Sequence, residues 1–251
     1  MSAQEYFESG IPIHRYQNRD IQEFMPATGD GENIEAISDH IERHIGKIDI
    51  VFHEIVSEIV HIDVHWIKPT EKFPFHSFVT SGMSDKPMNV PKGMEAYRYA
   101  ELCIFLPTNW TLQVEPYQTT DEAFKDERNY WPIRWLKKLA RFPHEYNTWL
   151  GRGHTIPNGE NADAFASNTQ FGCMALFSNI SIGRDFSELK VDDEKTIRFY
   201  CLFPLYKEEM ELKLEKGTKA LLNGFKKFRV TDIVDIDRPN ITKKKGLFGL
   251  W

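Results

Sequence analysis

Two strand-like runs, joined through a short turn that contains a glycine, constrain the fold more than any other feature. Residues 59–67 have the sequence IVHIDVHWI, which alternates, and residues 100–107 have the apolar sequence AELCIFLP. Residues 79–88, VTSGMSDKPM, lie between them, and 75–81 predicts a further strand. Alternation with a period of two indicates a strand with two different faces, and a continuous apolar run is typical of a central strand. We therefore expect a β-sheet in which the turn that contains the glycine lies between two strands.

Helical periodicity appears before, between and after the strand-like runs. Isoleucines recur at helical spacing over 34–45, with Asp30 or Asn33 as the candidate cap. The expected helices span 34–45, 119–150 and 207–225. In the second, Pro132 fits the first turn of a helix, and Pro143 ends that helix or starts a new one. The third is expected to break at Gly217, with Thr218 as the cap of its second part. The expected strands are 48–67 (one or two, with a turn near 53–57), 75–81, 99–106, 171–182, 197–205 and 233–236.

This order of elements predicts a single α+β domain with a mixed β-sheet flanked by helices. We expect an N-terminal extension at 1–30, the domain itself at 31–240, and a basic and apolar tail at 241–251. Residues 151–169 are rich in glycine and polar residues, which predicts a long loop on the surface.

Composition excludes several classes of function. No apolar run approaches the roughly 20 residues that a membrane helix needs, and the N-terminus is too polar for a signal peptide. Residues 1–125 hold 10 Lys and Arg against 20 Asp and Glu, whereas residues 126–251 hold 21 against 17. An acidic half disfavours nucleic acid and speeds encounter with a basic partner, although ordinary solvated surface would look the same.

The three cysteines lie inside apolar strand-like runs. Cys103, Cys173 and Cys201 are an odd number without the close spacing of a metal site, which predicts buried free thiols and a reducing, cytoplasmic compartment. The sequence identifies no cofactor.

His61, Asp63 and His65 alternate along one strand, so the three side chains are expected on one face. Two imidazoles and a carboxylate could bind zinc, and a metal-assisted hydrolase that uses these residues is the alternative function. The competing interpretation is the polar face of a half-buried strand. Because the sequence shows no further ligand, we expect the protein to be metal-free.

The turn itself offers Ser84 as a candidate nucleophile. The segment SGMSDKP lacks the Gly-x-Ser-x-Gly pattern of hydrolases, and no base or oxyanion hole is visible. A structural turn beneath a binding surface is the preferred interpretation of Thr80, Gly82, Met83 and Ser84.

This ordered series of strand, Thr-x-Gly-Met-Ser turn and strand resembles the Suppressor of fused (SUFU) domain family. Three further stretches are similar to bacterial members: 131–158, 202–222 and 234–240. The resemblance implies a protein-binding module, because the animal protein clasps an extended peptide as an added strand. Bacterial members resemble immunity proteins, antitoxins that neutralise a polymorphic toxin by direct binding.

The resemblance therefore implies a protein partner, such as a basic toxin domain with nuclease activity, and no catalytic residue. We expect the partner at the loops 81–92 and 153–160 and on the neighbouring strand face, with the helices at 119–150 as the alternative surface. The predicted partner-binding residues are His61, Asp63, Thr80, Gly82, Met83, Ser84, Asp85, His154 and Asn158.

Overall fold

An eight-stranded sheet forms the centre of the computed structural model, which describes residues 5–6, 10–16, 33–53, 59–112 and 126–243. The strands in spatial order are β3 (Ile50–Phe52), β4 (Asp63–Ile67), β5 (Phe75–Ser81), β6 (Ala100–Pro107), β10 (Thr196–Tyr206), β8 (Phe171–Phe177) and β7 (Thr155–Pro157), and β9 (Glu188–Lys190) pairs with the start of β10. Only β6 and β10 run parallel, and every other neighbouring pair is antiparallel.

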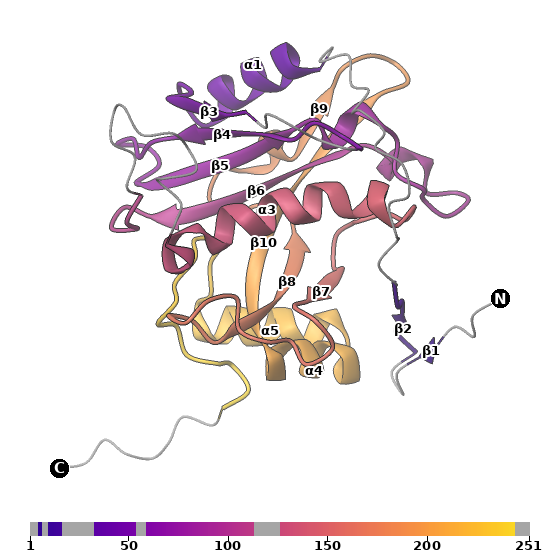
Figure 1. Ribbon diagram of the computed structural model, residues 1–251, viewed down its shortest axis with the longest axis vertical. Coiled ribbons are helices and arrows are strands. Elements are labelled where there is room, and N and C mark those ends of the chain that lie inside the picture. The colour runs from indigo at the N-terminus through magenta and orange to yellow at the C-terminus, as the bar shows by residue number, and fades with distance from the viewer. Residues whose placement is uncertain (1–4, 7–9, 17–32, 54–58, 113–125, 244–251) are drawn as a thin grey trace.

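Helices cover both faces of this sheet (Figure 1). They are α1 (Ile34–His44), α3 (Glu127–Glu145), α4 (Lys207–Lys216) and α5 (Thr218–Phe228). One apolar core lies between α3 and the sheet and contains Trp131 and Trp135, and a second core on the other face contains residues of α1 and α5. The predicted single α+β domain with a mixed sheet is confirmed.

The central strands form because their side chains are apolar on both faces. Every residue of β8, and all of β6 except Pro107, is buried. The three cysteines are free and buried, as predicted, and Cys103 of β6 faces Cys201 of β10 in the parallel register. Burial in apolar surroundings raises the pKa of the Cys201 thiol well above its usual value, which keeps it protonated and unreactive.

Helix α3 shows how a proline is accommodated inside a helix. Asp126 caps the helix by accepting a hydrogen bond from the backbone N–H of Arg128 at 3.0 Å. Pro132 lies beyond the first turn, contrary to prediction, and has no N–H for the Arg128 carbonyl. The side chain of Asn168 donates to that carbonyl instead, at 2.9 Å. The missing hydrogen bond is thus replaced from outside the helix.

Several element boundaries differ from prediction. The helix expected at 119–150 spans Glu127–Glu145, and 119–125 lie outside the described residues. The predicted strand 171–182 ends at Phe177, and strand β7 lies inside the predicted loop 151–169 because that loop folds back beside β8.

The caps and the last strand also differ in detail. Gly217, and not Thr218, occupies the cap of α5, and its φ of 81° explains why glycine is needed there. Asn33 lies at the cap of α1 but makes no side-chain capping bond, while Asp30 is outside the described part of the chain. The strand predicted at 233–236 is reduced to one parallel bridge between Ile233 and Phe105. The turn predicted near 53–57 lies outside the described residues except for His53.

The N-terminal segment contributes a short ribbon of β1 (Glu5–Tyr6) and β2 (Pro12–Ile13). Tyr16, which follows, packs its ring against Phe142 of α3 and hydrogen-bonds to the hydroxyl of Thr148 at 2.7 Å. In the part of the chain that the structure describes, no helix combines the length and the apolar character needed to cross a membrane.

Candidate functional site

The glycine turn follows directly from the end of β5. Gly82 has a φ of 104°, and a Cβ atom at this position would overlap the carbonyl oxygen of His61. Only glycine fits both the backbone conformation and this close approach. Residues Met83–Asp85 then form a single 3-10 turn.

A buried glutamate explains the polar residues of the Thr-x-Gly-Met-Ser segment. Glu101 of β6 has no exposed surface and accepts hydrogen bonds from the Thr80 hydroxyl at 2.5 Å and from the Ser84 hydroxyl and backbone N–H at 2.7 and 2.9 Å. Burial raises the pKa of the Glu101 carboxyl to about 7, while these hydrogen bonds act in the opposite direction. Thr80 and Ser84 therefore hold the turn onto the sheet.

The rest of the turn is attached to helix α3 and to the segment that precedes strand β4. Met83 is fully buried, and its carbonyl accepts a hydrogen bond from Nε2 of His144 at 2.9 Å. The ammonium group of Lys86 donates to the carbonyl of Ile59 at 2.9 Å. These contacts fix the first part of the loop at Met83 and at Lys86.

The two loops predicted to bind a partner are joined by the segment that follows α3. The backbone N–H of Asn89 donates to the carbonyl of Thr148 at 3.0 Å. The next residue, Trp149, packs edge-on against the ring of His154, with centroids 4.4 Å apart. Residues 85–92, 147–150 and 153–160 therefore form one continuous band, which we call the loop band.

Within the loop band, the predicted residues differ in how far they reach solvent. Asp85, His154 and Asn158 are half-buried. The amide of Asn158 donates to the carbonyl of Asp163 at 2.9 Å, so its side chain closes a local turn. Burial, together with the charges of Lys213 and His14, lowers the pKa of His154 to about 4.

The signature residues themselves are not on the surface. Thr80, Met83 and Ser84 have no exposed area, and Gly82 is buried. Asp63 is buried as well, so among the predicted residues only His61, Asp85, His154 and Asn158 expose part of their surface to a partner. The binding role of the set stays a prediction. The hydroxyl of Ser84 is buried against Glu101, so this arrangement offers no accessible nucleophile at Ser84.

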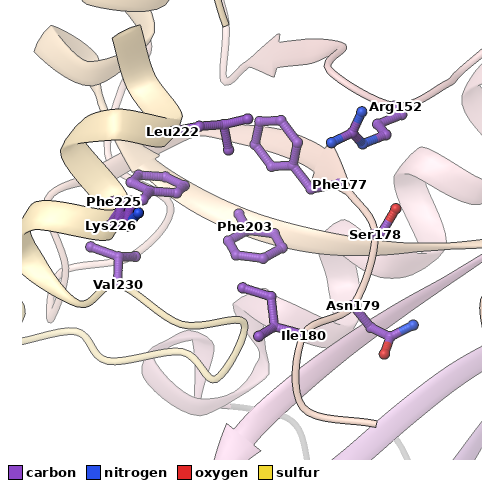
Figure 2. A pocket seen from close by; sticks show the side chains of 10 residues that line it. All are labelled: Arg152, Phe177, Ser178, Asn179, Ile180, Phe203, Leu222, Phe225, Lys226 and Val230. Atoms are coloured by element: carbon purple, nitrogen blue, oxygen red, sulfur yellow. The ribbon is translucent and has the colours of Figure 1, made fainter. Parts of the chain in front are cut away.

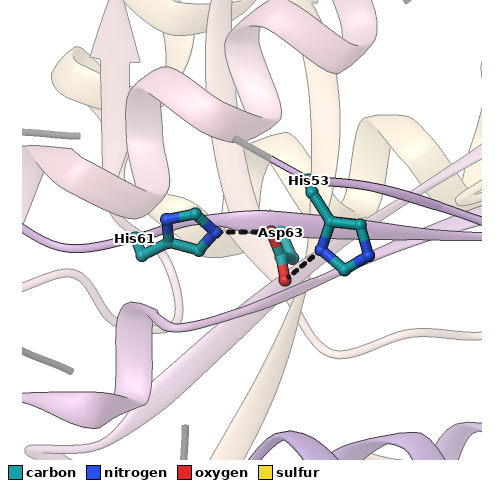
Figure 3. Close-up of side chains that lie close together, drawn as sticks. All are labelled: His53, His61 and Asp63. Carbon is teal, nitrogen blue, oxygen red and sulfur yellow. Dashed lines mark hydrogen bonds and ion pairs between the residues drawn. The ribbon is translucent and has the colours of Figure 1, made fainter. Parts of the chain in front are cut away.

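The histidines and the aspartate of strand β4 are arranged differently from prediction. Asp63 is hydrogen-bonded to Nδ1 of His53 at 2.9 Å and is paired with Nε2 of His61 at 3.0 Å through its other oxygen, as Figure 3 shows. His65 does not join them, because its Nε2 is hydrogen-bonded to the buried hydroxyl of Ser81 at 2.9 Å. Burial lowers the pKa of His65 to about 4. The hydrolase alternative, which needs His61, Asp63 and His65 together, loses one of its three residues.

Two residues of this region were not identified from the sequence. The signal for Glu101 is a single carboxylate inside an apolar strand, which requires buried partners. The signal for His53 is the hairpin register, in which Phe52 pairs with Val64 and so brings His53 beside Asp63. Strand β4 is also not half-buried, since all five of its residues are buried.

A hollow of about 350 Å³ lies at the end of β8, next to α5 (Figure 2). Its lining consists of Arg152, Phe177, Ser178, Asn179, Ile180, Phe203, Leu222, Phe225, Lys226 and Val230. Ile180 is 62% exposed, yet its backbone N–H is held by the carboxylate of buried Asp232 at 2.5 Å. The apolar walls and the basic side chains of Arg152 and Lys226 suit a ligand that has an apolar part next to an anionic one. No pattern in the sequence predicts this hollow.

The fold and this site define a class of protein: an α+β domain whose polar signature residues fix a loop through a buried carboxylate. The sequence model of the Suppressor of fused protein (SUFU) family matches residues 59–239. The chain belongs to the SUFU family. A search of curated protein sequences gives no match.

Solved structures share the fold at low sequence identity. A SUFU homologue from Neisseria gonorrhoeae FA 1090 has a TM-score of 0.58 and 16% identity, over 85% of this chain and 98% of that one. A chain of the Sufu–Fu complex has a TM-score of 0.56 and 16% identity, over 86% and 93%. Drosophila Suppressor of Fused has a TM-score of 0.55 and 13% identity, over 86% of this chain and 52% of that one.

Proposed function

We propose that this chain is a protein-binding module, and that it acts as a cytoplasmic immunity protein that neutralises a cognate polymorphic toxin by direct binding. The fold relationship with a chain of the Sufu–Fu complex, in which a Sufu protein is bound to another protein, supports a protein partner. The three free, buried cysteines agree with a reducing compartment.

The loop that Glu101 holds is the observation that carries this proposal. The polar groups of Thr80 and Ser84 are consumed inside the protein, so they are not available for chemistry on a substrate. Their hydrogen bonds to Glu101 hold a loop in place, and the exposed residues Pro87, Asn89 and Lys92 lie at its tip. Loops held by a rigid scaffold are common binding surfaces, because less conformational entropy is lost when they bind.

The neighbouring segment extends this surface. Asn89 donates its side-chain amide to the carbonyl of Asn147 at 3.1 Å, and His154 packs on Trp149. The loop band thus presents backbone and side-chain polar groups from three segments of the chain. A basic toxin domain, such as a nuclease, would be steered by the acidic residues 1–125 and would dock on the loop band.

The test uses the full-length protein and the product of the gene beside it, with any toxin activity removed by mutation. The variants Asp85→Ala and His154→Ala change the loop band, and Lys190→Ala on exposed strand β9 is the control. We expect at least about a tenfold loss of affinity for one loop-band variant, since a few anchors dominate most interfaces. Thermal melting checks that each variant stays folded.

Two outcomes would count against the proposal. Equal affinity of both loop-band variants and the control would move the binding surface to another face, with helix α3 as the next candidate. Absence of any complex with the neighbouring gene product would remove the immunity role itself. An association rate that does not fall with added salt would remove the steering argument alone.

A further inference from the structure

The cluster of His53, His61 and Asp63 has the composition of a metal site. Each residue offers one ligand atom, and the three atoms lie within 4.8 Å of one another. Two imidazole nitrogens and one carboxylate oxygen are a common donor set for zinc and related ions. The candidate set from the sequence was His61, Asp63 and His65, and in the structure His53 takes the place of His65.

Binding an ion needs the ligand atoms, which lie within 4.8 Å of one another, to move to the spacing of a coordination shell. Two ligands at about 2.1 Å from a tetrahedral ion are about 3.4 Å apart. The nitrogens of His53 and His61 lie 2.9 and 3.0 Å from the two oxygens of Asp63, so these contacts would lengthen by roughly half an ångström. A pair of ligand atoms at the 4.8 Å limit would instead approach by more than about 1 Å, which rotation of the exposed His53 ring can supply. Each imidazole would present its lone pair in place of its N–H and carry its proton on the other nitrogen.

The elements around the cluster already hold two of the ligands in place. Asp63 begins β4 and has only 4% of its side chain exposed. His61 lies two residues earlier, on the same face, and its carbonyl packs against Gly82. Its side chain is 38% exposed, and that of His53 is 69% exposed. The cluster is therefore anchored on its buried side and open to solvent on the other.

We propose that His53, His61 and Asp63 bind one divalent transition-metal ion of the zinc class. The ion would link the end of β3 to the start of β4 and would keep at least one coordination position open toward solvent. This inference is independent of the proposed immunity function. It adds a metal site to the edge of the sheet, next to the turn that begins at Gly82.

The experiment measures zinc binding to the full-length protein after chelator treatment and dialysis. Titration calorimetry gives affinity and stoichiometry, and the visible spectrum of the cobalt(II) form reports the ligand set. The variants are His53→Ala and His61→Ala, with His14→Ala as the control, because His14 is exposed and outside the cluster. Replacing the exposed His53 keeps the fold, which thermal melting verifies.

We expect one zinc ion per chain and a loss of at least about 100-fold in affinity for each ligand variant, more than the roughly 10–100-fold typical of outer partners. The His14 control should bind as the parent does, and the cobalt spectrum should be lost in both ligand variants. Binding of the parent no tighter than that of the ligand variants, or an equal loss in the His14 control, would overturn the proposal.

Discussion

The hydroxyl of Ser84 donates a hydrogen bond to the carboxylate of Glu101 over 2.7 Å, at a place where neither side chain has any exposed surface. The two residues are 17 positions apart and belong to the turn after β5 and to strand β6. A residue that looks like a nucleophile in the sequence is thus a structural donor in the fold.

Glu101 should make the stability of the protein fall as the pH rises. Its pKa is raised from 4.5 to about 7 in the folded state, so the folded state binds the proton more tightly than the unfolded state does. The contribution to stability is complete below about pH 4.5 and is lost as the pH rises through about 7, by about 3 kcal/mol at most. Urea unfolding of the parent and of Glu101→Gln over this range checks it.

The amide in Glu101→Gln has the same shape and cannot ionise. With rising pH, the free energy of unfolding of the parent should therefore fall relative to that of the variant. A constant difference between about pH 4.5 and 8 would contradict the raised pKa.

Gly82→Ala should prevent folding or reduce stability by more than about 3 kcal/mol, because the new methyl group meets the His61 backbone in a left-handed conformation. Gly93 is the matched control, since it has a φ of 88° but open space around its Cβ position. Gly93→Ala should cost only the backbone strain of about 1–2 kcal/mol. Thermal and urea unfolding measure both, and similar losses would contradict the steric argument.

The buried ion pair of Glu209 and Arg238 should be essential. Arg238 donates to both carboxylate oxygens at 2.6 Å, and the exposed fractions are 0% and 8%. Arg238→Ala leaves a buried charge without its partner, with an expected loss of about 3–5 kcal/mol. Lys190→Ala, which breaks the exposed pair with Asp193, should cost about 0–1 kcal/mol. Chemical unfolding measures the loss of stability in both variants, and equal losses would contradict the prediction.

His154 should titrate near pH 4 in the folded protein. Burial lowers its pKa from 6.5 to about 4, so its contribution to stability is present above about pH 6.5 and is lost as the pH falls toward 4. NMR titration of the ring protons measures this directly. Lys213→Met should raise the pKa, since the Lys213 charge is one of its causes. A ring that titrates near 6.5 in the parent would contradict the prediction.

The sequence was informative where a pattern is local. Helical spacing predicted α1, whose Ile37 and Ile41 are fully buried, and apolar runs predicted the central strands β6 and β10. Alternation also placed Ile62, Val64 and Trp66 together, and all three lie in the core beneath α3.

The remaining features depend on contacts between distant segments. Which histidine lies beside Asp63 is decided by the β3–β4 register and by the hydrogen bond of His65 to Ser81, and neither is visible in a periodic pattern. Pro132 gave a misleading helix start, because Asn168 replaces the lost hydrogen bond from 40 residues away. Half-burial of β4 was wrong as well, since all five of its residues are buried and Ile67 on the second face joins the core that contains Ile37 and Ile41 of α1.

The parallel pairing of β6 with β10 also has a consequence for synthesis on the ribosome. Strands β3 to β6 can pair with one another as soon as residue 107 has emerged, but β10 does not begin until Thr196. During the translation of some ninety intervening residues, an apolar β6 presents an open edge of unsatisfied backbone groups. The growing chain is therefore most exposed to aggregation in this interval, and closure of the sheet must wait for the last third of the sequence.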